Sequence, residues 1–138
     1  MGDWPWGAVP FSYEKAVQPV WDRRCVRCHD ARDPRKLDLT GRLDADGVPA
    51  SYRTLIEGGW VHYFDCDWGR KHRLAPPLSF GVVKSKLRGV LDGEHQGVRL
   101  GREEIYPVKC WIDLNCPLWP DYLYRPDRLA RGAPAVDG

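Results

Sequence analysis

The sequence predicts a mainly α fold, in which several short helices are joined by long ordered loops. Apolar residues recur at helical spacing in separate stretches of the chain, and several of these stretches follow a serine that can cap a helix. The segments between them contain many of the 14 glycines and 12 prolines, which favour turns. A length of 138 residues suits one domain with a core of its own.

The first part of the chain is expected to contain one helix and one long loop. Residues 1–10 are rich in aromatic residues and proline, which predicts an aromatic N-terminal arm rather than a helix. Ser12 is a suitable N-cap for a helix over about 13–29, in which Pro19 introduces a kink or delays the start. Residues 30–50 alternate charged residues with single leucines between turn formers, which indicates a loop.

Less regular structure is expected in the middle of the chain. Within the loop, residues 37–39 suggest a short extended segment. Ser51 is a suitable cap for a short helix through Ile56, which the pair Gly58-Gly59 ends. The aromatic stretch 60–68 is compatible with a strand or with a pocket wall.

Two further helices are expected before an irregular end. Ser79 caps one that continues until Gly93, since apolar residues recur between them at helical spacing. The closing helix covers about 102–115, with acidic residues at its N-terminal end and Pro107 in its early turns. Residues 123–138 predict an irregular C-terminal tail.

The pentapeptide Cys25-Val26-Arg27-Cys28-His29 is the feature around which the chain is organised. Two cysteines three residues apart on a helical turn can each form a thioether with a haem vinyl group, and the next residue then places an imidazole against the iron. Cys25 and Cys28 are therefore the expected attachment points of one covalent haem c, and His29 is the expected proximal iron ligand. The alternatives are half of a zinc site, a redox-active Cys-x-x-Cys pair and a structural disulfide.

Three stretches carry a resemblance to known proteins. Residues 11–29, with Val-Gln-Pro-Val before Cys-x-x-Cys-His, resemble the opening of planctomycete-type cytochrome c domains. Residues 109–117, with a Trp-Ile-Asp core, resemble their closing helix. The stretch 77–100 is similar to the haem-bearing domain of proteins related to the hydrazine synthase alpha subunit. The resemblance implies a small, mainly helical monohaem cytochrome c domain over residues 11–122.

Electron transfer by this haem is the favoured function, and two others remain open. A shared fold does not imply hydrazine chemistry, because function belongs to sites rather than to folds. The residues that follow His29 also lack a zinc and tyrosine arrangement. A haem enzyme module with an open iron site, acting on small nitrogen compounds, is the alternative. A cofactor-free interaction domain held together by cysteines is the third.

The ligand on the distal face of the iron separates the first two functions. The only methionine is Met1, at the end of the chain, so a histidine is favoured. The setting of His95 resembles that of a histidine in the related domains, which makes it the favoured distal ligand. His62 is the runner-up, and His72 lies between basic residues typical of a solvated surface. Two imidazoles predict a low-spin iron with a potential below that of a histidine/methionine site, whereas an open iron predicts a catalyst or sensor.

Three further cysteines, Cys66, Cys110 and Cys116, have no role in haem attachment. An oxidising compartment favours one disulfide and one remaining thiol among them. Three pairings are open, and we expect Cys66 to be one of the partners.

Charge and composition limit the partners. The chain has 21 basic and 19 acidic side chains, a net charge of +2, without the concentrated basic face that a nucleic-acid binder needs. Three roles are open for the basic residues near the motif: a solvated surface, pairing with the haem propionates, or docking of a redox partner protein. These residues are Arg23, Arg24, Arg27, Arg32, Arg35 and Lys36. The many Trp and Tyr side chains would suit a homo-oligomer or a larger cytochrome assembly.

Export is expected because haem c is attached outside the bacterial cytoplasm. No stretch approaches the roughly 20 apolar residues that cross a bilayer, so we expect no membrane span. The first residues also lack the basic and apolar regions of a secretory signal. The sequence therefore predicts a periplasmic or extracellular protein whose signal peptide is absent from this chain.

Overall fold

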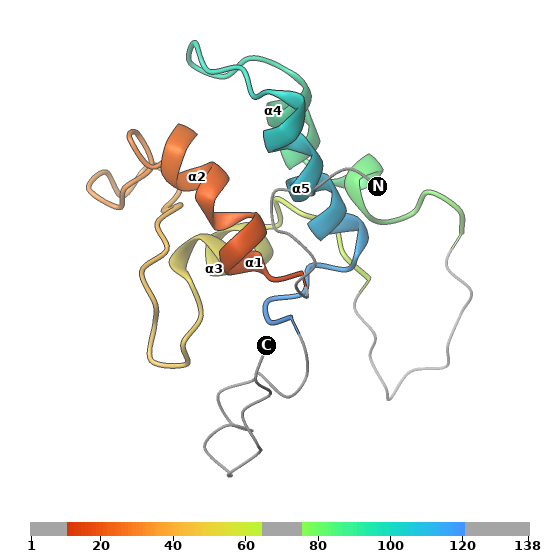
Figure 1. Ribbon diagram of the computed structural model, residues 1–138, viewed down its shortest axis with the longest axis horizontal. Helices are drawn as coiled ribbons and strands as arrows, with labels where there is room; N and C mark the ends of the chain where they lie inside the picture. Colours follow the sequence, from red (N-terminus) through yellow and green to blue (C-terminus); the bar gives the residue numbers. More distant parts are fainter. Residues whose placement is uncertain (1–10, 65–75, 121–138) are drawn as a thin grey trace. The chain divides into compact units, whose positions relative to one another are not determined.

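The computed structural model describes residues 11–64 and 76–120, and these residues are mainly helical (Figure 1). The aromatic arm 1–10 and the tail 123–138 lie outside the described residues. Along the chain the helical elements are α1 (Tyr13–Ala16), α2 (Gln18–Arg24), α3 (Ala50–Glu57), the 3-10 helix η1 (Val82–Lys84), α4 (Leu87–Asp92) and α5 (Arg102–Asp113).

The described residues contain no β-strand, so the prediction of a mainly α chain is confirmed. Two isolated antiparallel bridges join Leu43 to Pro49 and His95 to Val98, and each closes a short loop. Residues 60–64, the described part of the aromatic stretch, form no strand. Within the same described ranges, no helix is long and apolar enough to cross a membrane.

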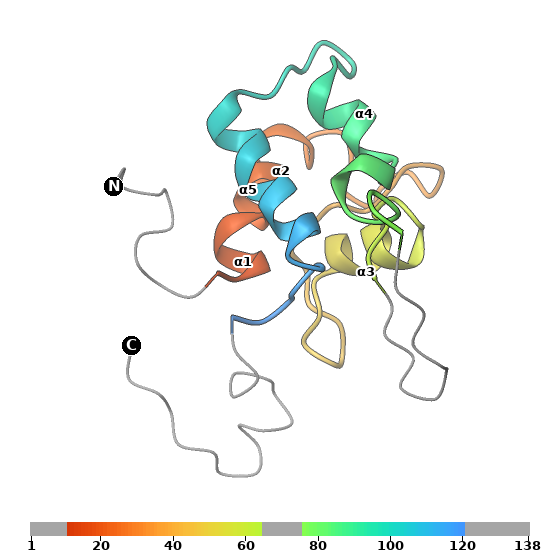
Figure 2. The same ribbon diagram turned by 90° about the vertical axis from the view of Figure 1, so that its right-hand side faces the viewer.

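The chain divides into two compact units, and the division falls within α3. Unit 1 consists of residues 1–54 and 117–138, and unit 2 consists of residues 55–116. Unit 1 contains α1 and α2, which pack against each other. In unit 2, η1 contacts both α4 and α5, and a long segment joins these two helices (Figure 2).

The first helix is interrupted, contrary to the prediction of one helix over 13–29. α1 begins after Ser12, whose Oγ accepts a hydrogen bond from the amide of Lys15 at 3.2 Å. Pro19 lacks an amide hydrogen and its ring would clash with the carbonyl of Lys15, so the helix breaks at Val17 and restarts as α2. α2 ends at Arg24, and the pentapeptide continues as hydrogen-bonded turns.

α3 ends as predicted at the glycine pair, but it does not begin as predicted. Gly59 has a φ of +67°. The amides of Gly59 and Trp60 donate to the carbonyls of Ile56 and Leu55, which is the Schellman arrangement. Ser51 does not cap the helix, because α3 starts one residue earlier and the serine is buried.

The helix predicted from Ser79 to Gly93 is two shorter elements, η1 and α4. Ser85 separates them, because its Oγ donates to the carbonyl of Gly81 at 2.9 Å and accepts the amide of His62 at 2.9 Å. These bonds hold the chain in a turn where the apolar spacing had indicated a continuous helix. Ser79 therefore caps neither element.

α5 matches the predicted closing helix to within two residues. Glu104 Oε2 accepts the amide of Gly101 at 2.9 Å and so caps the N-terminal end. At the other end, Asn115 has a φ of +68°, and the amides of Asn115 and Cys116 donate to the carbonyls of Ile112 and Trp111. α5 thus ends in a second Schellman motif, with asparagine where glycine is the usual residue.

Side chains at this end of α5 also hold distant segments of unit 2. Asp113 Oδ1 accepts the amide of Val82 at 2.9 Å, in a space that Gly81 leaves open because a Cβ there would lie 2.6 Å from the same oxygen. The amide group of Asn115 pairs with the backbone of Phe64, accepting its N–H at 2.6 Å and donating to its carbonyl at 2.9 Å. The closing helix therefore organises unit 2 through its last turn.

Candidate functional site

The pentapeptide forms a compact turn directly after α2. The amides of Cys25 and Val26 both donate to the carbonyl of Trp21, at 2.8 and 2.9 Å. The amides of Cys28 and His29 then both donate to the carbonyl of Cys25, at 3.0 Å each. The backbone is therefore fixed at both ends of the Cys-x-x-Cys spacing, although the segment is no longer a regular helix.

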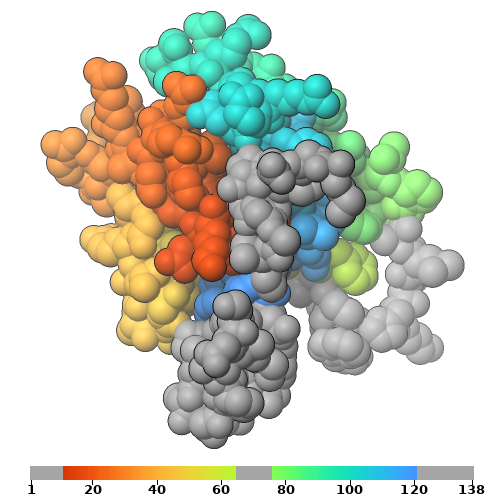
Figure 3. Space-filling view, in the orientation of Figure 1, coloured from red at the N-terminus to blue at the C-terminus, as the bar shows by residue number. Residues whose placement is uncertain are grey.

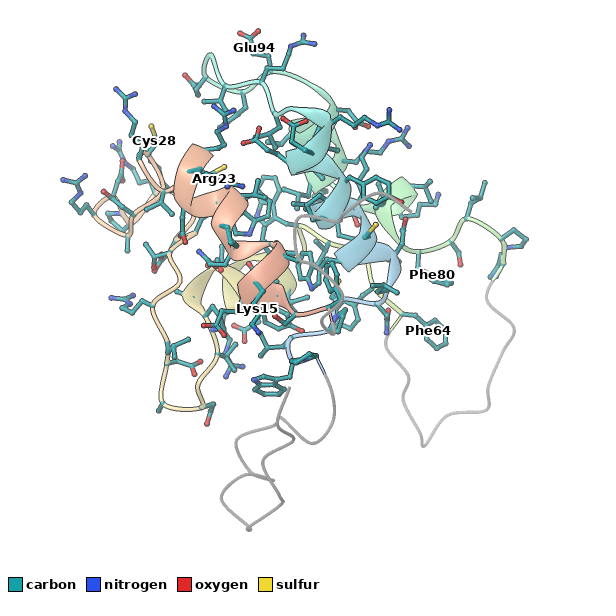
Figure 4. The ribbon with its side chains drawn as sticks, in the orientation of Figure 1. Lys15, Arg23, Cys28, Phe64, Phe80 and Glu94 are labelled. Carbon is teal, nitrogen blue, oxygen red and sulfur yellow. The ribbon has the colours of Figure 1, made fainter. Side chains whose placement is uncertain are left out.

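Both cysteines of this turn carry thiols, and they differ in exposure. Cys28 is exposed and Cys25 is half-buried. Figure 4 shows Cys28 in the loop that follows α2, with its sulfur directed away from the helix. The orange segment around residues 27–36 also forms part of the surface in Figure 3. Cys28 is therefore accessible from solvent.

The imidazole of His29 is oriented by a backbone carbonyl. Its Nδ1 lies 3.1 Å from the carbonyl oxygen of Leu37, and the ring is half-buried. A carbonyl oxygen can only accept a hydrogen bond, so this contact requires the proton on Nδ1. The neutral ring then carries its lone pair on Nε2, the nitrogen that would bind a metal.

The segment 37–39 provides this carbonyl and is itself bonded to His29. The amide of Leu39 donates to the carbonyl of His29 at 2.9 Å, so the histidine is held through both its ring and its backbone. Asp38 shapes the same segment, because its Oδ1 accepts the amide and the hydroxyl of Thr40 at 3.0 and 2.7 Å.

A buried polar network in unit 1 reaches the same segment from the other side. Trp21 Nε1 donates to the hydroxyl of Tyr13 at 3.0 Å, and that hydroxyl donates to Ser51 Oγ at 2.8 Å. Ser51 Oγ donates to Gln18 Oε1 at 2.5 Å, and Gln18 Nε2 donates to the carbonyl of Leu39 at 3.1 Å. Burial raises the pKa of Tyr13, which keeps its hydroxyl protonated and able to donate.

Charged side chains around the motif are partly neutralised by near neighbours. Arg32 pairs with Asp30, and Arg35 pairs with Asp33 at 3.0 Å. Hydrogen bonds from these arginines lower the pKa of each carboxyl below its ordinary value. All these pairs join residues two apart on an exposed loop, so they shape the loop and add little to stability.

Both described candidates for the distal ligand, His95 and His62, are exposed and belong to unit 2, whereas the pentapeptide belongs to unit 1. The amide of His95 donates to the carbonyl of Val98 at 3.0 Å, and the amide of Val98 donates back at 2.9 Å. Gln96 and Gly97 between them both have positive φ, as in a type I′ turn. His95 is therefore presented at the base of a tight turn.

The runner-up histidine is held differently. The amide of His62 donates to Ser85 Oγ at 2.9 Å, and its carbonyl accepts the amide of Gly81 at 2.7 Å. These bonds fix its backbone beside η1. His72 lies outside the described residues.

Of the three remaining cysteines, Cys110 and Cys116 are thiols in the structure and Cys66 lies outside the described residues. Cys110 is half-buried on α5, and Cys116 is buried just beyond its end. Burial raises the pKa of both thiols, that of Cys116 to about 12. The expected disulfide that includes Cys66 stays a prediction.

The ranges 11–64 and 76–120 contain no cluster of three or more His, Cys, Asp or Glu side chains arranged to hold a bare metal ion. The candidate donor groups of the pentapeptide are the thiols of Cys25 and Cys28 and the oriented imidazole of His29, which follow one another within five residues of the turn after α2. Sequence reasoning identified these three residues. It missed Gln18 and the Leu37 carbonyl, because the extended segment expected at 37–39 carried no sign of a contact with His29.

No family model matches the chain, and no curated protein or solved structure matches it either.

Proposed function

We propose that this chain is a monohaem c-type cytochrome that transfers electrons. Cys25 and Cys28 would form thioethers with the two haem vinyl groups, and His29 would bind the iron from the proximal side. The observation that carries the proposal is the Nδ1 contact of His29 with the Leu37 carbonyl, in a turn that also holds both thiols. Such a contact orients an iron-binding imidazole and raises its basicity.

The donor set fits a haem c better than it fits the other uses of a Cys-x-x-Cys pair. A structural zinc site needs four ligands, and the described residues contain no group of three or more His, Cys, Asp or Glu side chains arranged to hold one metal ion. Haem attachment needs only His29 of the three to bind the metal, because the two cysteines bond to the porphyrin. A redox pair does not need the adjacent imidazole with its proton fixed on Nδ1. A bound haem c supplies one reversible electron at its iron, while this chain holds the ring, the thiols and the surrounding charges in place.

His95 is the proposed distal ligand and His62 the alternative. Both side chains are exposed, and His95 sits on a backbone that a tight turn fixes. Ligation by two imidazoles leaves no position for a substrate at the iron, which favours electron transfer over catalysis. The resemblance to planctomycete-type cytochrome c domains supports the same function, and it supports a periplasmic or extracellular location with a redox protein as partner.

The decisive experiment is expression in a bacterial periplasm together with a haem c attachment system. We expect the mass of the purified chain to increase by one haem, which stays attached under denaturing conditions. The double variant Cys25→Ser/Cys28→Ser should carry no covalent haem, whereas Val26→Ala, within the same turn, should be loaded normally. A wild-type chain without haem would contradict the proposal.

The reduced spectrum then separates the electron carrier from the haem enzyme. Sharp bands that carbon monoxide leaves unchanged indicate a six-coordinate iron and support electron transfer. A shift with carbon monoxide indicates an open site and supports catalysis on small nitrogen compounds. His95→Ala should make the spectrum sensitive to carbon monoxide. If the spectrum of this variant is unaltered, His95 is not the distal ligand and His62 takes its place. His62→Ala then tests that second assignment.

A further inference from the structure

The segment 37–39 lies between His29 and Gln18 and is hydrogen-bonded to both. On one side, the Leu37 carbonyl accepts His29 Nδ1 and the Leu39 amide donates to the His29 carbonyl. On the other side, the Leu39 carbonyl accepts Gln18 Nε2 at 3.1 Å. Any movement of the segment away from Gln18 therefore changes its position relative to the imidazole.

The amide group of Gln18 is fixed in a single orientation. Its Oε1 accepts Ser51 Oγ, and its Nε2 donates both to Leu39 and to Asp22 Oδ1, the latter at 2.9 Å. The residue is only 5% exposed, so losing these partners would leave buried polar groups unsatisfied. If the amide were flipped, its NH2 group would face the Ser51 hydroxyl, which now donates to it, and its oxygen would face the Leu39 carbonyl, which cannot donate.

Gly41 provides the space that this orientation needs. A Cβ built on Gly41 would lie 3.3 Å from both Cδ and Cγ of Gln18 and 3.4 Å from Nε2. Because the φ of Gly41 is not in the left-handed region, the close approach of the glutamine is the reason that a glycine suits this position.

From these contacts we propose that Gln18 is a positioning residue for the iron ligand. By holding Leu39, it keeps the Leu37 carbonyl against the Nδ1–H of His29, and so it sets the orientation and basicity of the imidazole. The inference rests on the proposed haem function. It goes further because it assigns control of the proximal ligand to a residue 11 positions earlier in the chain, on the first turn of α2.

The test compares Gln18→Met with Tyr13→Phe in the haem-loaded chain. Methionine keeps the length of glutamine without its hydrogen bonds. Tyr13→Phe removes hydrogen bonds from the outer part of the same network but leaves Gln18 bonded to Leu39. Both variants should lose stability, which makes the second a control for damage to the core of unit 1.

Two readouts report on the imidazole itself. The exchange rate of the His29 Nδ1–H, followed by nuclear magnetic resonance in the reduced protein, should rise about fivefold in Gln18→Met, as expected for one weakened hydrogen bond. The reduction potential should also rise, because a less basic imidazole stabilises the oxidised iron less. Tyr13→Phe should leave both quantities near their wild-type values.

Equal changes in the two variants would show that Gln18 is only structural and would overturn the inference. If Gln18→Met does not fold, Gly41→Ala takes its place, since it leaves the glutamine present and displaces its amide by a few tenths of an ångström. A wild-type chain without haem would contradict the proposed function instead. The exchange measurement on that haem-free chain would still decide whether Gln18 controls His29.

Discussion

Two segments of this protein carry cysteines in opposite settings. Cys28 lies exposed in a turn beyond the end of α2, whereas Cys116, just beyond the end of α5, is only 3% exposed. Both residues follow a helix whose last carbonyls are satisfied by backbone amides. The difference is that the first turn stays at the surface, while the second is folded back by a Schellman motif.

This contrast separates a thiol that can react from one that fills space. Thioether formation needs an accessible sulfur, and Cys28 is exposed whereas Cys25 is half-buried. Cys116 instead contributes an apolar atom to the core of unit 2, in which Trp111 and Ile112 are also buried. The position of a cysteine relative to a helix end does not decide its role, because the fold of the following residues does.

The largest effect expected from this contrast is on alkylation. In the haem-free chain, with a phosphine present to keep cysteines reduced, Cys28 should react far faster than Cys116. Burial raises the pKa of Cys116 to about 12, which lowers the fraction of this thiol present as reactive thiolate, and burial also limits access to the sulfur. Peptide mapping by mass spectrometry over time measures both rates.

Haem attachment provides the control for this comparison. After loading, Cys25 and Cys28 should no longer react, while the rate at Cys116 should stay the same. Similar rates at Cys28 and Cys116 in the haem-free chain would mean that the end of α5 opens readily. That result would contradict the expected difference in accessibility between the two cysteines.

A smaller effect is expected from changing the residue that folds the chain back after α5. Asn115→Ala places an ordinary side chain at a φ of +68° and removes the pairing with Phe64, at a total cost of about 2 kcal/mol in the free energy of unfolding. Asn115→Gly removes the pairing but suits the backbone, so it should cost less. Denaturant unfolding gives the free energy of unfolding of the wild type and both variants, and so their order of stability.

Alkylation of Cys116 should follow the same order, fastest in the alanine variant. If the glycine variant were as unstable as the alanine variant, the backbone conformation of Asn115 would not be what holds Cys116 in place.

The smallest effect expected is a loss of stability in alkali. Because the folded-state pKa of Cys116 is raised above its ordinary value, the unfolded chain releases this proton first as the pH rises. The stabilising contribution is complete below pH 9 and is lost progressively between pH 9 and about 12. Unfolding measured at pH 8.5 and pH 10 should therefore show a larger loss in wild type than in Cys116→Ala.

Cys28→Ala is the matched control, since Cys28 is exposed and its removal should leave the wild-type loss unchanged. An equal loss in wild type and Cys116→Ala would assign the alkaline effect to other groups.

Local features of the fold could be predicted from the sequence, and longer-range ones could not. Pro19 predicted a kink or a late start in a single first helix, and the chain instead breaks next to it, between α1 and α2. The pair Gly58-Gly59 predicted the end of α3. Both signals act on backbone within one helical turn. Ser85 breaks the helix expected after Ser79, because it bonds to His62, 23 residues away. Nothing in the apolar spacing signals such a partner.

The candidate site likewise has a local part that could be predicted from the sequence and a longer-range part that could not. The spacing of Cys25, Cys28 and His29 was readable from five consecutive residues, since the proposed attachment of haem c depends only on residues of that pentapeptide. The Leu37 carbonyl could not be identified, because any backbone carbonyl in the following loop was an equal candidate. Only folding selects one of them.

By itself, then, the sequence determined a mainly α chain and one five-residue motif with two thiols and an imidazole. Tertiary structure decided which ring nitrogen of His29 carries the proton, because it places the Leu37 carbonyl beside Nδ1. It also decided which side chain holds that segment, because it bonds Gln18 to the Leu39 carbonyl. The reason is that helix ends and motif spacing depend on neighbours in the chain. The bonds from Gln18 instead reach Leu39 and Ser51, 21 and 33 residues away, and buried polar groups that distant find each other only in the folded state.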